Sequence, residues 1–341
     1  MYVYELERLE HLRNWLTLKN EVLRPIADES GNGHWGVVKH GDVVPFDMDL
    51  RPDMSPKGLF FAERETVMKF DGTLFRETLP EQKPQVLFGL KACDLTAIAY
   101  QDNHFKDDPY YQARRKNTLL IGIDCQEACE NGFCASVDAG PHVDTDIADL
   151  VVTPMPHMAD DEHGWWVICA SPEGQAAIAG LGLAPADPGW ENWRDMARRH
   201  AEATFPKDTH IINGIQRING RAVPDEAWER FAHQCISCSG CSMMCPTCSC
   251  YATRDVPEAE GVIARERIWD SCLMVGFQKE ASGANPAAEA GKRVYRYWYH
   301  KFSDDVAARA GRYMCVGCGR CEATCPGMIG VHSIMEKIAN A

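Results

Sequence analysis

The sequence predicts an α/β domain over residues 1–225 followed by a mainly helical domain over residues 226–341. Three observations support this fold class. A strand–helix–strand pattern covers residues 86–123, charged segments of helical character cover residues 190–230, and cysteine runs separated by helical stretches begin at Cys235. Because the sequence pattern changes near residue 225, we place the domain boundary there.

The first elements follow from the spacing of apolar residues. Residues 5–23 are predicted to form an amphipathic helix, which Pro25 ends. Its apolar side is formed by Leu6, Leu9, Leu12 and Leu16. Residues 36–80 alternate short apolar runs with Pro and Gly, a pattern that predicts short strands and turns.

Residues 86–90 and 118–123 are continuous apolar runs, which predict two buried strands. Between them, residues 95–105 read as a helix with Asp94 at its N-cap. This order predicts two parallel strands joined by a right-handed crossover. Residues 165–169 are predicted to form a further strand.

Composition excludes several classes of protein. The chain has 341 residues, 45% of them apolar, and a net charge of −14. This acidity argues against nucleic acid and anionic membranes as partners. The sequence has no apolar run long enough to span a membrane and no signal-peptide pattern at its start, so a cytoplasmic location is expected. The sixteen cysteines are then expected to bind metal rather than to form disulfides.

Charge is unevenly distributed along the chain. Residues 117–193 contain thirteen acidic residues and no Lys or Arg. This stretch is either a solvated acidic face or a docking surface for a basic partner. Residues 292–301 (KRVYRYWYHK) are instead basic and aromatic, a mixture that suits a buried interface or a shell around a negatively charged cluster.

Two cysteine runs of identical spacing are the strongest motif. They are Cys235-x2-Cys238-x2-Cys241-x3-Cys245-Pro246 and Cys315-x2-Cys318-x2-Cys321-x3-Cys325-Pro326. This spacing is typical of proteins with two [4Fe–4S] clusters, in which the fourth cysteine of each run binds the other cluster. We therefore assign Cys235, Cys238, Cys241 and Cys325 to a first cluster, and Cys315, Cys318, Cys321 and Cys245 to a second.

Structural zinc is the alternative for these runs, but zinc sites usually use paired C-x2-C units. About 70 residues separate the two runs, far more than in a compact bacterial ferredoxin. The wide gap, with its helical content, favours an α-helical ferredoxin-like domain.

A further group of cysteines follows the two predicted parallel strands. Cys93 comes after the first strand and Cys125 after the second, with Cys129 and Cys134 close behind. Ligands of open α/β sheets gather at the carboxyl ends of strands. The four thiols, with Asp94 as an alternative oxygen ligand, therefore predict a third cluster. The alternative is that Cys93 and Cys125 are simply buried small residues.

Other features predict less. Cys248, Cys250 and Cys272 are too few for a cube, so they either bind a metal with help from a histidine such as His300 or pack near the clusters. Cys169 is expected in the core. Residues 31–36 match G-x-G-x-x-G but lack the preceding strand of a dinucleotide site, so we predict a turn.

The residues resemble a known family of 4Fe–4S dicluster proteins, which contains the A subunit of anaerobic sulfite reductases and the β subunit of cytosolic [NiFe] hydrogenases (sulfhydrogenases). The matching segments are LKACDLTAI (90–98), YYQARR (110–115), CISCSGCSMMCPTCSCY (235–251), WDSC (269–272), ASGANP (281–286), HKF (300–302) and CVGCGRCEATCP (315–326). The family often reads C-F-C where this chain has Gly132, Phe133 and Cys134, so Cys129 is expected to supply the missing thiol.

The resemblance implies an electron-transfer subunit with no catalytic residues of its own. Its partners would be a flavin subunit that takes electrons from NAD(P)H and a catalytic subunit that holds a siroheme or a nickel–iron centre. The segment after Cys325 (PGMIGVHSIMEKI) resembles the sulfite reductase branch more than the hydrogenase branch. A second hypothesis, from a different class, is a scaffold in which the clusters are structural and the α/β domain binds a ligand or partner.

Overall fold

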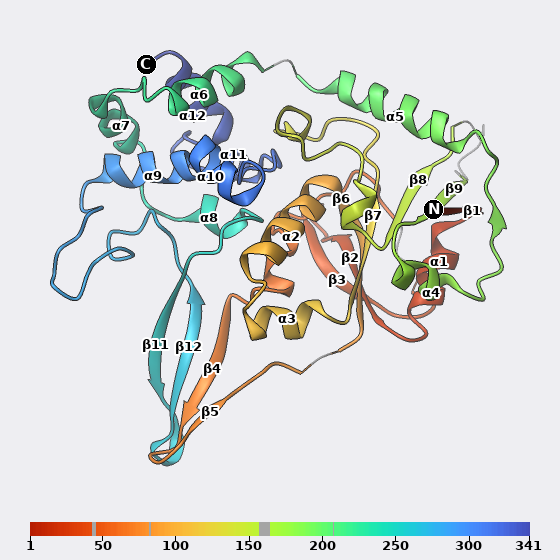
Figure 1. Ribbon diagram of the computed structural model, residues 1–341, viewed down its shortest axis with the longest axis horizontal. Helices are drawn as coiled ribbons and strands as arrows, with labels where there is room; N and C mark the ends of the chain where they lie inside the picture. The colour runs from red at the N-terminus through yellow and green to blue at the C-terminus, as the bar shows by residue number, and fades with distance from the viewer. Residues whose placement is uncertain (43–45, 82, 157–163, 207) are drawn as a thin grey trace. The chain divides into compact units, whose positions relative to one another are not determined.

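The computed structural model describes residues 1–42, 46–81, 83–156, 164–206 and 208–341 (Figure 1). The chain packs as two compact units. The N-terminal unit contains Met1–Met54, Glu81–Ala99 and Arg114–Pro206, and the C-terminal unit contains Ser55–Pro80, Tyr100–Ala113 and Lys207–Ala341. The domain boundary near residue 225 stays a prediction, because the units are defined by packing and each uses discontinuous segments.

An eight-stranded sheet forms the centre of the N-terminal unit (Figure 1). Its strands, in spatial order, are β10 (Ala184–Pro185), β1 (Tyr2–Leu6), β9 (Trp165–Cys169), β8 (Leu150–Pro154), β7 (Thr118–Ile123), β6 (Gln85–Lys91), β2 (Glu21–Ala27) and β3 (Gly33–Val38). The neighbours β2, β6, β7 and β8 pair in parallel, and the outer pairs are antiparallel. This arrangement confirms an α/β N-terminal region.

The predicted strand–helix–strand unit is confirmed by β6, α2 (Ala92–His104) and β7. The strands are buried because their apolar runs pair with neighbours on both sides. The N-cap prediction is wrong, since α2 begins at Ala92 and places Asp94 in its first turn. Cys93 and Cys125 both lie just past the carboxyl ends of their strands, as the parallel pairing requires.

The predicted helix over residues 5–23 is wrong in extent. Only α1 (Leu9–Leu16) is helical, and the flanking residues form β1 and β2. Sheet pairing overrides local helical spacing here, because Val22 and Leu23 pair with β6. Pro25 lies beyond this pairing, where its missing N–H costs no bond to β6. The turn predicted over residues 31–36 is wrong in extent: Gly31, with a φ of 84°, lies in the β2–β3 connection, but residues 33–36 belong to β3 and pair with β2.

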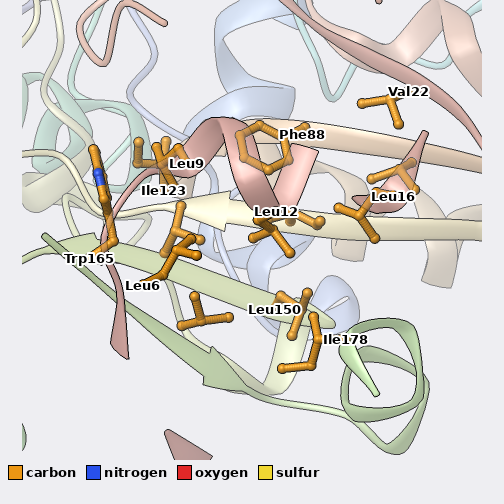
Figure 2. Packing of buried hydrophobic residues seen from close by; sticks show 14 of the residues in the cluster. Leu6, Leu9, Leu12, Leu16, Val22, Phe88, Ile123, Leu150, Trp165 and Ile178 are labelled. Atoms are coloured by element: carbon orange, nitrogen blue, oxygen red, sulfur yellow. The ribbon is translucent and has the colours of Figure 1, made fainter. Parts of the chain in front are cut away.

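The core of the N-terminal unit lies between α1 and the sheet (Figure 2). Leu9, Leu12 and Leu16 occupy one side of α1 and contact apolar residues of the strands, such as Phe88 and Ile123. Each fully buried side chain of this size contributes about 1.5–3 kcal/mol. Helix α4 (Pro172–Ile178) adds Ile178 to this core. The other helices are α5 (Trp190–Thr204), which belongs to the same unit, and α3 (Pro109–Arg115), which contributes residues to both units.

The C-terminal unit combines helices with a four-stranded antiparallel sheet. The helices are α6 (Thr209–Asn219), α7 (Asp225–Ala232), α8 (Gly240–Met244), α9 (Ala290–Phe302), α10 (Asp304–Ala310), α11 (Arg320–Ala323) and α12 (Val331–Ala339). The strands, in spatial order, are β11 (Tyr251–Pro257), β12 (Ile263–Trp269), β4 (Arg64–Phe70) and β5 (Phe75–Glu77). The α-helical ferredoxin-like description stays a prediction for this unit, which includes a sheet as well.

Strands β4 and β5 join this sheet although they come early in the chain. Arg267 of β12 is 4% exposed and donates to Glu65 of β4 at 2.9 Å, and it also pairs with Asp108. Buried ion pairs of this kind fix which strands meet, since an unpaired partner would be costly. No helix in the described part of the chain is long and apolar enough to cross a lipid bilayer.

Candidate metal centres

The two cysteine runs share one backbone course in the C-terminal unit. Ser237 and Ser239 of the first run have φ values of 54° and 63°, and Gly317 and Gly319 of the second run have 65° and 70°. These left-handed residues bend each loop between its cysteines. A short helix follows each loop, α8 in the first run and α11 in the second, and the two helices pack together. The repeat in sequence is therefore a repeat in structure.

The first set of cysteines lines one cavity. Cys235, Cys238 and Cys241 of the first run and Cys325 of the second run all border it. Tyr297 of α9 lies alongside and donates its hydroxyl to the carbonyl of Cys241 at 3.1 Å. Burial raises the pKa of Cys241 to about 12. Because iron binds the thiolate, binding of the cluster would have to displace the proton of this thiol. The four predicted ligands of the first cluster are thus gathered around one space.

The second set is close enough for its sulfurs to interact electrostatically. Burial raises the pKa of Cys315 to about 12, with further contributions from Cys245 and Cys318. The pKa of Cys321 is also raised by burial and by the same neighbours. Cys245, although it belongs to the first run, is thus near enough to Cys315 and Cys321 for its charge to raise the pKa of both thiols.

Three donors surround the sulfur of Cys245. Lys301 Nζ donates to Cys245 Sγ at 3.1 Å, and Thr247 Oγ1 lies 3.2 Å from the same sulfur. A hydrogen bond from Cys248, together with the charge of Lys301, lowers the pKa of Cys245 well below its usual value, and the same bond raises the pKa of Cys248. The sulfur of Cys245 therefore lies in a setting that favours its deprotonated form, which is the form that binds iron.

The remaining two cysteines of this region form a second sulfur pair. A hydrogen bond from Cys272 lowers the pKa of Cys250 to about 6, and the same bond raises the pKa of Cys272. His300, the histidine considered as a helper ligand, is exposed on α9. In the described ranges, no three His, Cys, Asp or Glu side chains converge as a single metal ion requires.

The third group of cysteines lines a cavity of about 320 Å³ within the N-terminal unit. Cys93, Cys125, Cys129 and Cys134 all border it, at the carboxyl ends of β6 and β7. Asp94 is 1% exposed and is not among the residues that line this space. The four predicted thiols thus border one cavity, whereas Asp94, the alternative oxygen ligand, does not.

Other polar groups at this cavity were not predicted. Its carboxylates are Asp49, Glu127 and Glu130, and its cations are Arg51 and Lys91. Glu127 and Glu130 flank Cys129 in the sequence, so the sequence alone could have indicated that these two carboxylates lie at the cavity. Asp49 and Arg51 come from a distant segment that no local pattern connects to the cysteines.

The cations act on the cavity sulfurs. Arg51 Nη1 donates to Cys129 Sγ at 3.4 Å and Nη2 donates to the carbonyl of Glu130 at 3.3 Å. Burial raises the pKa of Cys125 to about 11, and the charge of Lys91 opposes that rise. The cavity therefore places two cations beside its thiols, and positive charge of this kind favours the thiolate form. The carboxylates Asp49 and Asp124 act on Cys125 in the opposite direction.

A buried ion pair holds the loop that contains Cys125. Arg194 Nε donates to Asp124 Oδ2 at 2.7 Å, and Arg194 Nη2 donates to the carbonyl of Val143 at 2.6 Å. Asp124 Oδ1 accepts from the amide of Val143 at 2.8 Å, and the side chain of Asp124 is fully buried. This network ties α5 to the end of β7 and so positions Cys125.

We expect Arg194→Met to lower the free energy of unfolding by about 3 kcal/mol, because it leaves the carboxylate of Asp124 buried without its partner. Arg199→Met is the matched control, since Arg199 lies on the same helix, is 73% exposed and pairs with Asp195. It should cost less than about 1 kcal/mol. Urea unfolding of the full chain measures both, and equal losses would contradict this role of Asp124.

Comparison with known proteins agrees with this geometry. Residues 234–329, which contain both runs, match the 4Fe–4S dicluster domain. The C-terminal part of this chain is a 4Fe–4S dicluster domain. Such a domain binds two [4Fe–4S] clusters, and the eight gathered cysteines supply thiolates of the kind that these clusters need.

The similarity extends well beyond the dicluster domain. Over 323 residues the chain is 29% identical to sulfhydrogenase 2 subunit beta of Pyrococcus furiosus, and the alignment covers 89% of this chain and 91% of that subunit. The chain is therefore an iron–sulfur electron-transfer protein similar to a sulfhydrogenase beta subunit. The predicted family resemblance is confirmed over most of the chain.

Proposed function

We propose that the chain relays single electrons between a flavin subunit that oxidises or reduces NAD(P)H and a catalytic subunit of a multisubunit oxidoreductase. Cys235, Cys238, Cys241 and Cys325 hold the first cluster. Cys315, Cys318, Cys321 and Cys245 hold the second. When bound, the clusters supply one-electron chemistry, and the protein sets their potentials through burial, hydrogen bonds and nearby charge.

The observation that supports this proposal most is that Cys325 of the second run borders the cavity of the first run. The charge of Cys245, which raises the pKa of Cys315, supports the reciprocal exchange. Helix α8 begins just before Cys241 and ends just before Cys245, so one short segment supplies ligands to both sites. The two clusters are then neighbours, which a relay requires.

Stepwise reduction of the anaerobically purified chain, followed by electron paramagnetic resonance (EPR), tests the relay. We expect two clusters that each take up one electron at physiological potentials. Clusters that stay in one redox state throughout would instead support the scaffold hypothesis and would contradict the relay.

We further propose a third cluster at the cavity lined by Cys93, Cys125, Cys129 and Cys134. Support comes from the shared cavity and from the cations Arg51 and Lys91 beside the sulfurs. About twelve irons per chain are expected, against about eight for the dicluster domain alone.

Two variants locate this iron. Cys93→Ser should remove about four irons per chain and leave the two dicluster signals intact. Cys169→Ser is the control, because Cys169 is buried in β9 within the core, and it should retain all the iron. About eight irons in the wild-type chain would contradict the third cluster without affecting the relay.

The catalytic partner has two candidates, each favoured by a specific observation. The segment after Cys325 favours an anaerobic sulfite reductase-type complex, and the similarity to a sulfhydrogenase subunit favours a complex with a nickel–iron catalytic subunit. Purification of the native complex decides between them. A siroheme absorption band identifies the sulfite reductase type, and nickel identifies the hydrogenase type.

A further inference from the structure

Lys301 is a buried cation whose polar contacts are to sulfur and a hydroxyl group. It lies in the last turn of α9 and is 4% exposed. Its Nζ donates to Cys245 Sγ at 3.1 Å, to Thr247 Oγ1 at 3.1 Å and to Cys248 Sγ at 3.2 Å. Among the residues that the structure describes, no Asp or Glu forms a salt bridge with this ammonium group.

A buried ammonium group is costly unless a negative charge lies beside it. The group that meets this need at Lys301 is sulfur, since its Nζ contacts the sulfurs of both Cys245 and Cys248. Of these two cysteines, Cys245 is the one assigned to a cluster. Lys57 shows a different arrangement. It is also 4% exposed, but it donates to the carbonyl of Ser242 at 3.1 Å and lies 3.9 Å above the ring of Trp269.

The first site differs in this respect. Among the described residues that line its cavity, which include Tyr297 and Trp298 of α9, there is no Lys or Arg. The two sites therefore share ligand spacing and backbone course but differ in the charge that contacts their sulfurs.

We propose that Lys301 is a positioning residue that selectively raises the reduction potential of the second cluster through Cys245. This inference rests on the proposed assignment of Cys245 to that cluster. Reduction adds one electron to the cluster and breaks no bond, and Lys301 keeps its proton. Because the added electron makes the cluster more negative, a charged donor on its ligand stabilises the reduced form more than the oxidised form.

The test is an EPR-monitored redox titration of the full chain with its clusters bound. Lys301→Met should make reduction of one cluster at least tenfold less favourable, a fall of about 59 mV for a one-electron couple. Lys301→Arg, which keeps the charge, should restore most of the potential. Lys292→Met is the matched control, because Lys292 lies on the same helix with its side chain 56% exposed and pairs with Glu289. It should shift neither cluster.

The iron content of each Lys301 variant shows whether a changed titration reflects a shifted potential or a lost cluster. Unchanged potentials in a Lys301→Met variant that retains its iron would overturn the proposal and leave the relay intact. Equal shifts in Lys301→Met and Lys292→Met would also overturn it. If Lys301→Met loses a cluster, Lys301→Gln, which keeps an N–H donor without the charge, is titrated instead. Loss of the cluster in both neutral variants would make Lys301 an assembly residue and overturn the tuning role. Failure of the proposed function is distinct, since the wild-type clusters would then not change redox state at all.

Discussion

Replacing Cys245 with serine is expected to remove the cluster of the second run, although Cys245 belongs to the first run in sequence. The loss should be about four irons per chain, because a [4Fe–4S] cluster needs its fourth thiolate. Three donors stabilise the thiolate of Cys245, and its neighbours include Cys315 and Cys321. Iron content and the EPR spectrum of the reduced variant measure the effect.

Two further variants, Cys325→Ser and Cys248→Ser, test the same prediction. Cys325→Ser should lose the same EPR signal as Cys235→Ser, because both cysteines border the first cavity. Cys248→Ser keeps a hydrogen-bond donor beside Cys245 and should retain all the iron. If Cys245→Ser and Cys235→Ser lost the same signal, the exchange of fourth cysteines would be wrong.

Gly327→Ala is expected to lower the free energy of unfolding by about 3 kcal/mol, near the upper end for overpacking a tight contact. A Cβ at Gly327 would lie 2.1 Å from the carbonyl oxygen of Gln234 and 3.1 Å from its carbon. Both atoms belong to backbone, so neither moves as a flexible side chain does. Because Gln234 precedes Cys235 and Gly327 follows Cys325 by two residues, this contact brings the two runs together at the first cavity.

The same substitution should therefore reduce loading of the first cluster while sparing the second. Gly276→Ala is the matched control, since a Cβ there would meet nothing within 4 Å, and its cost should stay within about 0.5 kcal/mol. Chemical unfolding and iron content measure both variants. Equal stability of the two variants would contradict the close approach at Gly327.

Short sequence patterns predict those parts of the fold that depend mainly on residues close together in the chain. The apolar runs of β6 and β7 and the helix between them fix a parallel pair, and this pair brings Cys93 and Cys125 to one cavity. The spacing of the two runs likewise predicts which cysteines gather. These strands and loops are specified mainly by contacts between residues that lie close together in the sequence.

Long-range contacts account for what the sequence does not reveal. Residues 64–77 form strands as expected, but ion pairs such as Arg267 with Glu65 place them in the C-terminal sheet. Arg51 reaches the third cavity from outside every cysteine motif. The basic and aromatic segment that contains Lys301 indicates either a buried interface or a shell around a cluster, and only the fold shows that its ammonium group contacts Cys245.

The EPR spectrum of the fully reduced chain, recorded beside that of Cys245→Ser, tests the central claim most directly. Two neighbouring clusters tied by exchanged cysteines should give an interacting spectrum in the wild type. In Cys245→Ser this spectrum should simplify to that of the first cluster alone. An interacting two-cluster spectrum that survives in the variant, or a wild-type chain that shows no reducible cluster, would contradict the account.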